Sequence, residues 1–314
     1  MEKVLGMIGL YLAAAAGTLV LGLAGRWYDR KLTAAIQYRK GPPWYQPLAD
    51  VLKLFYKETL VPSTARVTGF LVAPAISLAA AGLAAAMLWA PLLDPGGSFV
   101  GDLVVVIYLL LIPPLMTIMG ASASGSPQAA VGASREMKLV MGYELPFVLA
   151  LLAGVIHNGW TLRLGSMASQ SPALYSVSGA LAAVVVVLAL QAKLGQVPFD
   201  VAEAECEIMS GVYVEYSGPP LGVIYLGRSL LAAAMPLLVI VVFWGGLRAT
   251  PLGIAAFAGK YLLLVTLVTL IRNTNPRLRI DQAMRFFWYG LTPLAALAVV
   301  LALAARSGAG WTWL

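Results

Sequence analysis

Long apolar runs are the feature that most constrains how this 314-residue chain can fold. A helix that crosses a bilayer needs roughly 20 apolar residues. Eight runs reach or approach that length, at residues 4–25, 67–91, 101–121, 139–156, 178–194, 221–244, 251–271 and 287–305. Only 11% of the residues are charged, too few to cover a water-soluble domain of this size. We therefore expect an all-α integral membrane protein, with about eight transmembrane helices forming one domain over residues 1–314.

The basic residues lie mainly in the connections on one side of the predicted bundle. Fifteen Lys and Arg residues lie in connections 26–66, 122–138, 195–220 and 272–286 or, for Lys193, at the edge of the third, against four on the other side. This positive-inside bias predicts a multi-pass protein of the cytoplasmic membrane, with its long loops in the cytoplasm and both termini outside. It also indicates that the net charge of +7 reflects membrane topology and not nucleic-acid binding.

Residues that commonly ligate redox metals are scarce. The chain contains one cysteine, Cys206, and one histidine, His157. A cysteine-ligated iron–sulfur cluster or zinc site within this chain is therefore excluded, and a haem site is disfavoured. We expect neither a redox cofactor nor a metal site in this chain.

A different kind of helix is predicted over residues 43–58, directly after Pro42. Its charged residues lie largely away from a stripe of apolar residues at helical spacing, namely Trp44, Leu48, Val51, Leu52 and Phe55. Two interpretations stay open for this amphipathic helix. It lies in the lipid headgroups, or it seals a site between the membrane and a docked soluble subunit.

The connection 195–220 is acidic, and no Lys or Arg occurs from 194 to 227. Its carboxylates are Asp200, Glu203, Glu205, Glu207 and Glu215. After Pro198 we expect a helix on which all of them except Glu205 share a sector of about 120°. Carboxylates held close together and partly buried have raised pKa values and can exchange protons near neutral pH. A solvated acidic loop that faces a basic partner is an equally open alternative.

Glu144 is unusual because it lies inside an apolar run, six residues beyond Lys138. A carboxylate at that depth is costly, and its default interpretation is functional. The alternative is a Glu that is paired with a nearby basic residue or hydrogen-bonded near the interface. We favour the functional interpretation. Basic residues around 26–30 and 272–285 are candidates to balance the acids.

Four segments together resemble the subunit of respiratory complex I that joins its membrane arm to its peripheral arm, known as subunit 1 or as the H-type membrane component of NADH-quinone oxidoreductase. They are DRKLTAAIQYRKGPPWYQPLADVLKLFYKE, GYELPF, PFDVAEAECEIMSGVYVEYSG and NPRLRIDQAMRFFW, in the family's order and spanning nearly the whole chain. The short loop GPPWYQPLAD and the stretch SREMKLVMGYELPF are most similar to the membrane-anchor subunit of membrane-bound (group 4) nickel–iron hydrogenases.

The resemblance implies a subunit without its own catalytic centre that anchors a peripheral arm and links electron transfer to proton or sodium translocation. It implies hydrogenase-like large and small subunits with iron–sulfur clusters and a nickel–iron site, and antiporter-like membrane subunits as neighbours. The implied coupling residues are Glu144, Asp200, Glu203, Glu205, Glu207 and Glu215, with basic partners Arg26, Arg30, Arg135, Arg277, Arg279 and Arg285. The implied docking residues for the arm are Gly41, Pro42, Pro43, Gln46, Asp50 and Lys53.

Two other functions stay open. One is the quinone-binding subunit of an NADH- or F420-type oxidoreductase, although the short loop at 41–50 argues for the hydrogenase branch. The other is an independent secondary transporter, which predicts inverted internal repeats. We find no convincing repeat in the sequence.

Overall fold

The computed structural model of the chain describes residues 2–94, 96, 98–247 and 250–306, without the side chains of residues 2–8, 10, 205 and 206. The described residues form helices and no strands. The long helices are α1 (Glu2–Ile36), α3 (Val67–Leu93), α4 (Asp102–Ala123), α5 (Pro127–His157), α7 (Val177–Lys193), α9 (Pro219–Val239), α10 (Pro251–Thr274) and α12 (Thr292–Arg306). Shorter segments are α2 (Gln46–Phe55), α6 (Leu164–Ser169), η2 (Ala173–Tyr175), α8 (Glu205–Ile208), η3 (Gly211–Tyr213), η4 (Ile240–Trp244), α11 (Ile280–Arg285) and η5 (Phe286–Leu291).

Each of the eight predicted apolar runs coincides with a helical segment, in chain order. In the described part of the chain, six segments are long and apolar enough to cross a membrane, and α7 is a shorter apolar helix. They are Val67–Leu93, Asp102–Ala123, Pro127–His157, Pro219–Trp244, Pro251–Thr274 and Ile280–Arg306. The predicted all-α membrane fold is confirmed.

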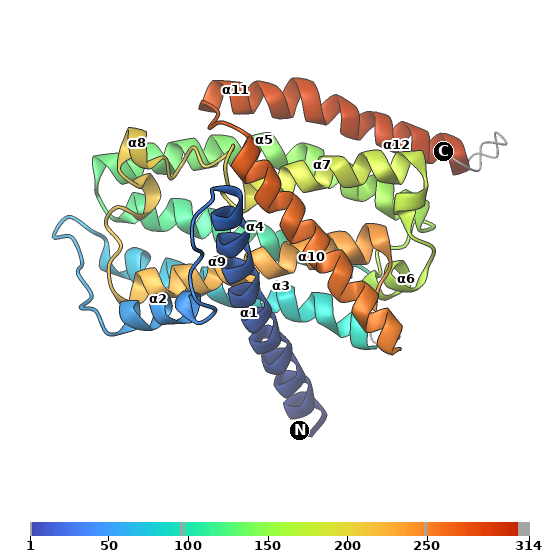
Figure 1. Ribbon diagram of the computed structural model, residues 1–314, viewed down its shortest axis with the longest axis horizontal. Helices are drawn as coiled ribbons and strands as arrows, with labels where there is room; N and C mark the ends of the chain where they lie inside the picture. Colours follow the sequence, from blue (N-terminus) through green and yellow to red (C-terminus); the bar gives the residue numbers. More distant parts are fainter. Residues whose placement is uncertain (1, 95, 97, 248–249, 307–314) are drawn as a thin grey trace.

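The two ends of the helical bundle carry different short segments. Helices α3, α4, α5, α7 and α9 run along the long axis of the molecule, whereas α1 and α10 cross this bundle obliquely (Figure 1). The segments α2 and α8 lie at one end, and α6 and the last turn of α12 lie at the other (Figure 1). We call these the α2 end and the α6 end. The amphipathic and acidic segments therefore share one end.

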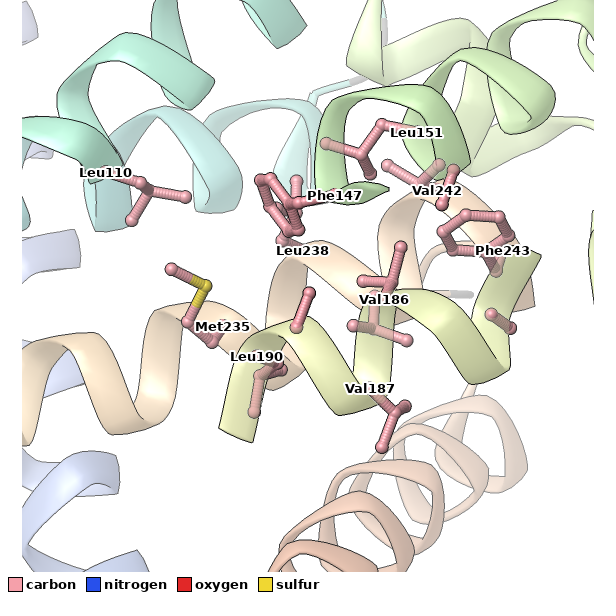
Figure 2. Packing of buried hydrophobic residues seen from close by; sticks show 14 of the residues in the cluster. Leu110, Phe147, Leu151, Val186, Val187, Leu190, Met235, Leu238, Val242 and Phe243 are labelled. Carbon is pink, nitrogen blue, oxygen red and sulfur yellow. The ribbon is translucent and has the colours of Figure 1, made fainter. Parts of the chain in front are cut away.

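The core consists of apolar side chains from α5, α7, α9 and η4. Phe147 and Leu151 of α5 lie against Leu190 of α7 and Leu238 and Val242 of the α9–η4 rod (Figure 2). All five are at most 1% exposed. Because lipid tails are as apolar as these side chains, dense packing between helices has to hold such a bundle together.

Helices α1 and α9 are in close backbone contact at Gly22. A Cβ atom at this position would lie 2.0 Å from the carbonyl oxygen of Ser229, so the backbones leave no room for a side chain. Such contacts at small residues are typical of membrane helices. One turn further along α1, Arg26 donates a hydrogen bond of 3.1 Å to the Ser229 hydroxyl.

The prediction of a helix after Pro198 is wrong. Only the four residues of α8 and the three of η3 are helical, and Met209 and Ser210 between them have φ values of 50° and 71°. The backbone bonds instead to other segments, since Leu278 donates its N–H to the Pro198 carbonyl. Gly211 lies directly against the Ala202 carbonyl oxygen, which a Cβ would meet at 2.1 Å. The predicted shared acidic face of a helix is therefore absent from the described part of this segment.

The predicted amphipathic helix exists but is shorter than residues 43–58, because α2 covers only Gln46–Phe55. Val51 is buried against the bundle, whereas Leu48, Leu52 and Phe55 are 43–49% exposed. This outward apolar stripe fits a helix at the edge of a bilayer.

Candidate functional site

The acidic segment is fastened to the bundle by ion pairs, which place a cation beside three of its carboxylates. Three of its carboxylates each pair with an arginine from a different part of the chain. The pairs are Asp200 with Arg277 (2.9 Å), Glu203 with Arg228 (2.8 Å) and Glu207 with Arg135 (2.5 Å). These arginines come from the connection before α11, from α9 and from α5. The segment is thus tied to three elements at once.

The acids differ in how far they are buried. The Glu207 side chain is 52% exposed, whereas the Glu203 side chain is 25% exposed. Glu215 is half-buried between η3 and α9. The side chain of Glu205 lies outside the described residues.

Glu144 pairs with a lysine that the sequence analysis did not select. The Lys193 ammonium, at the end of α7, lies 2.9 Å from Glu144 Oε2, and the lysine side chain is completely buried. The ammonium also lies over the Phe147 ring, 4.4 Å from its centroid. Glu144 Oε1 is buried without a hydrogen-bond partner among the described residues. One buried cation therefore holds the carboxylate, and the second oxygen, Oε1, can still accept a hydrogen bond.

A small cavity connects these two groups of charges. It has a volume of about 40 Å³ and is lined by Glu136, Lys193, Glu203 and Arg228 as well as by Thr117 and Tyr213. A water molecule needs about 10–15 Å³ of such space, so the cavity has room for a few waters. The cavity therefore places the Glu203–Arg228 pair beside Lys193, the partner of Glu144, and we call this series of groups the polar route.

Glu136 is the carboxylate of this route that sequence reasoning missed. It is half-buried, lines the cavity, and has no ion-pair partner among the described residues. In the sequence it lies beside Arg135 and Lys138, which suggests an ordinary solvated connection. The helix α5 begins at Pro127, however, so Glu136 lies well inside it. Glu136 and Tyr143 are seven residues apart and share one helix face.

The predicted basic residues have different environments. Arg26 donates to the Tyr225 carbonyl and lies over the Tyr225 ring, 5.1 Å from its centroid. Arg279 and Arg285 are exposed at the ends of α11. Sequence reasoning missed Lys193 and Arg228. Arg272, from the basic connection at 272–285, pairs with Asp29 at 2.5 Å and joins α10 to α1.

Part of the predicted docking segment is used within the chain. Asp50 accepts hydrogen bonds of 2.7 Å from both Arg30 and Gln46. The bond from Arg30 holds α2 against α1, whereas the bond from Gln46 lies within α2. Although partial burial acts to raise it, these hydrogen bonds keep the pKa of Asp50 below its ordinary value. The Pro42 carbonyl accepts from Trp27, and Gly41 packs on the backbone of Lys31.

Pro43 and Lys53 are exposed and are the docking candidates that face outward. No group of three or more potential metal-ligating side chains occurs among the described residues. The absence of a cofactor from this chain stays a prediction.

Comparisons with known proteins agree on one family. The model of the family described as NADH dehydrogenase matches residues 8–303. The H-type membrane component of NADH-quinone oxidoreductase from Anoxybacillus flavithermus is 33% identical, over 93% of this chain and 92% of the relative. Its counterpart from Thermomicrobium roseum is also 33% identical, over 90% of this chain and 91% of its own length.

Among solved structures, a chain of an archaeal membrane-bound sulfane sulfur reductase, a respiratory membrane complex, has a closely similar fold. It is 28% identical, the match covers 95% of this chain and 99% of that one, and the TM-score is 0.85. The architecture described above is thus shared along nearly the full length of both chains.

Proposed function

The chain belongs to the NADH dehydrogenase family, and from this premise we propose that it is the membrane-embedded junction subunit of a complex I-like, redox-driven ion pump. It anchors a peripheral electron-transfer arm at the α2 end and links electron transfer to the translocation of protons or sodium ions. It has no catalytic centre of its own. One observation carries the proposal: ionisable groups continue from the acidic segment, through the cavity beside Glu136, to the buried Lys193–Glu144 pair.

Ionisable groups within membrane-spanning helices are expensive, and they usually mark ion or proton pathways. Here Glu136 and Glu144 belong to α5 and Arg228 to α9, both long enough to cross a membrane. A bundle that only anchored other proteins would be more stable with apolar side chains at these positions. Proton or charge movement along the route gives these residues a role.

The peripheral arm is of the hydrogenase type or belongs to a closely related ferredoxin-dependent complex. The short loop at 41–50 and the structural likeness to a chain of a sulfane sulfur reductase support this choice. The arm then supplies the large and small subunits with the iron–sulfur clusters and the nickel–iron site. Antiporter-like membrane subunits continue the ion path sideways. In this arrangement the α2 end faces the cytoplasm, and both termini lie outside.

The coupling role is tested with Glu144→Gln in the intact complex. We expect electron transfer from the arm to an artificial acceptor to continue, while ion uptake into proteoliposomes falls about 100-fold or more, in the range typical for loss of a proton-transferring group. The control variant Glu2→Gln removes a carboxylate near the N-terminus and should pump normally. Pumping at the wild-type rate by Glu144→Gln would defeat the proposal.

The type of complex is tested by purification. A co-purifying large subunit with two paired-cysteine motifs that can hold nickel would establish the hydrogenase branch. Extractable quinone, or inhibition by quinone-site blockers, would instead support the quinone-reducing function of the curated relatives. Substrate transport by the purified chain alone would favour an independent transporter.

A further inference from the structure

A second polar cavity lies at the α6 end, away from the acidic segment. Its volume is about 430 Å³, within the range of small-molecule sites. The last turns of α5 and α12 and the start of α7 surround it. Its polar lining includes His157, Asn158, Thr161, Ser176, Ser178 and Arg306. None of these residues takes part in the proposed coupling route.

Arg306 brings a positive charge to this cavity. It belongs to the last turn of α12 and donates one hydrogen bond, 2.8 Å long, to the Ile156 carbonyl. A guanidinium has five N–H donors in a planar fork that suits phosphate oxygens. One backbone bond therefore leaves donors for an anionic ligand.

Asn158 adds a hydrogen-bond acceptor. The residue is 1% exposed, and its amide nitrogen donates to the Gly154 carbonyl at 2.9 Å. Its Oδ1 is buried without a hydrogen-bond partner among the described residues, as is Nδ1 of His157. Buried acceptors without partners are uncommon in native proteins. A matching ligand would bring a hydroxyl or ammonium donor as well as an anionic group.

We propose that this cavity binds the headgroup of a phospholipid, with the phosphate on Arg306 and a headgroup hydroxyl or ammonium on Asn158. Three apolar helices end around the cavity, which places it at the level of the headgroups. The side chains of Ala302 and Ala305 are small, so the α12 side of the cavity leaves room for a ligand. The neighbouring outer face of α12 exposes Leu297, Val300 and Leu303, an apolar path for acyl chains.

The test uses the intact complex in nanodiscs that contain photo-activatable lipids, with the crosslinked peptides mapped. The wild-type chain should crosslink at the peptides around 156–161 and 302–306. Phosphatidylglycerol and phosphatidylethanolamine should crosslink there more than phosphatidylcholine, whose headgroup has no hydrogen-bond donor for Asn158. This comparison needs no variant. Equal crosslinking of the three lipids would overturn the assignment of Asn158.

Arg306→Gln should reduce the crosslinking of all three lipids at these peptides about tenfold, the loss expected for one charge-assisted hydrogen bond. Arg163→Gln is the matched control, because Arg163 is an exposed arginine before α6 that does not line the cavity. Unchanged crosslinking in Arg306→Gln, or an equal loss in the control, would overturn the proposal.

Two further experiments distinguish a bound phospholipid from other occupants of the cavity. Soluble glycerol phosphate should compete much more weakly than the lipid, because it has no acyl chains to bury. Equal competition would make this a site for a free phosphoester. Crosslinking that appears only after deletion of residues 307–314, which lie outside the described part, would assign the cavity to that segment.

Discussion

At the scale of single residues, burying the Lys193–Glu144 ion pair carries a large free-energy cost. Both groups belong to helices packed in the apolar bundle, and the lysine is completely buried. Taking two charges out of water is costly, and their mutual attraction compensates only while both are present. A change of charge on either residue therefore changes the electrostatic energy of the other.

Removing one partner should destabilise the protein more than removing both. Lys193→Met leaves Glu144 facing an apolar side chain, and the expected loss is about 3–5 kcal/mol of folding free energy. The double variant with Glu144→Gln should recover much of it, as measured by thermal unfolding of the purified complex. Lys57→Met, at an exposed position, is the control. A single variant as stable as the wild type would show that the pair is not held in a low-dielectric site.

The Asp50 contacts predict a pH dependence of the attachment of α2. Because the pKa of Asp50 is lowered in the folded state, its bonds to Arg30 and Gln46 add stability above the ordinary carboxyl pKa. That stability is lost as the pH falls through the lowered value. The exchange of α2 amide hydrogens should therefore be slower in the wild type than in Asp50→Asn at neutral pH. The two should converge in acid, and an equal difference at all pH values would contradict this origin.

At the scale of elements, the contact between α1 and α9 depends on the absence of a side chain at Gly22. Gly22→Val should push the helices apart, at the cost of about 1–3 kcal/mol that is typical of overpacking. Gly17→Val is a control in the same helix, since a Cβ at Gly17 meets nothing within 4 Å. Thermal unfolding of the two variants measures the difference. Equal effects would mean that helix propensity, and not the close approach, is responsible.

The same scale shows what the sequence can predict. The spans were predictable because most of the apolar runs alone reach the length of a bilayer-crossing helix, with six such segments in the described part of the chain. The form of the acidic segment was not, because arginines distant in sequence and the Gly211–Ala202 contact determine it. Of the site, Glu144 was found by its depth in an apolar run. Glu136 was missed because hydropathy begins that run at 139, twelve residues after the helix itself begins.

At the scale of the whole molecule, the two ends should face opposite compartments. Single cysteines at Lys57, near α2, and at Arg163, before α6, can be labelled with a membrane-impermeant maleimide in a Cys206→Ala background. We expect Lys57→Cys to react only in inside-out vesicles and Arg163→Cys only in intact cells. The opposite pattern would reverse the proposed orientation and place the peripheral arm outside.

The three arginine contacts of the acidic segment have a mechanical consequence. They connect the segment to three elements, namely α5, α9 and the connection just before α11. A displacement of the acidic segment as one unit therefore strains its contacts with α5, with α9 and with the connection before α11 at the same time.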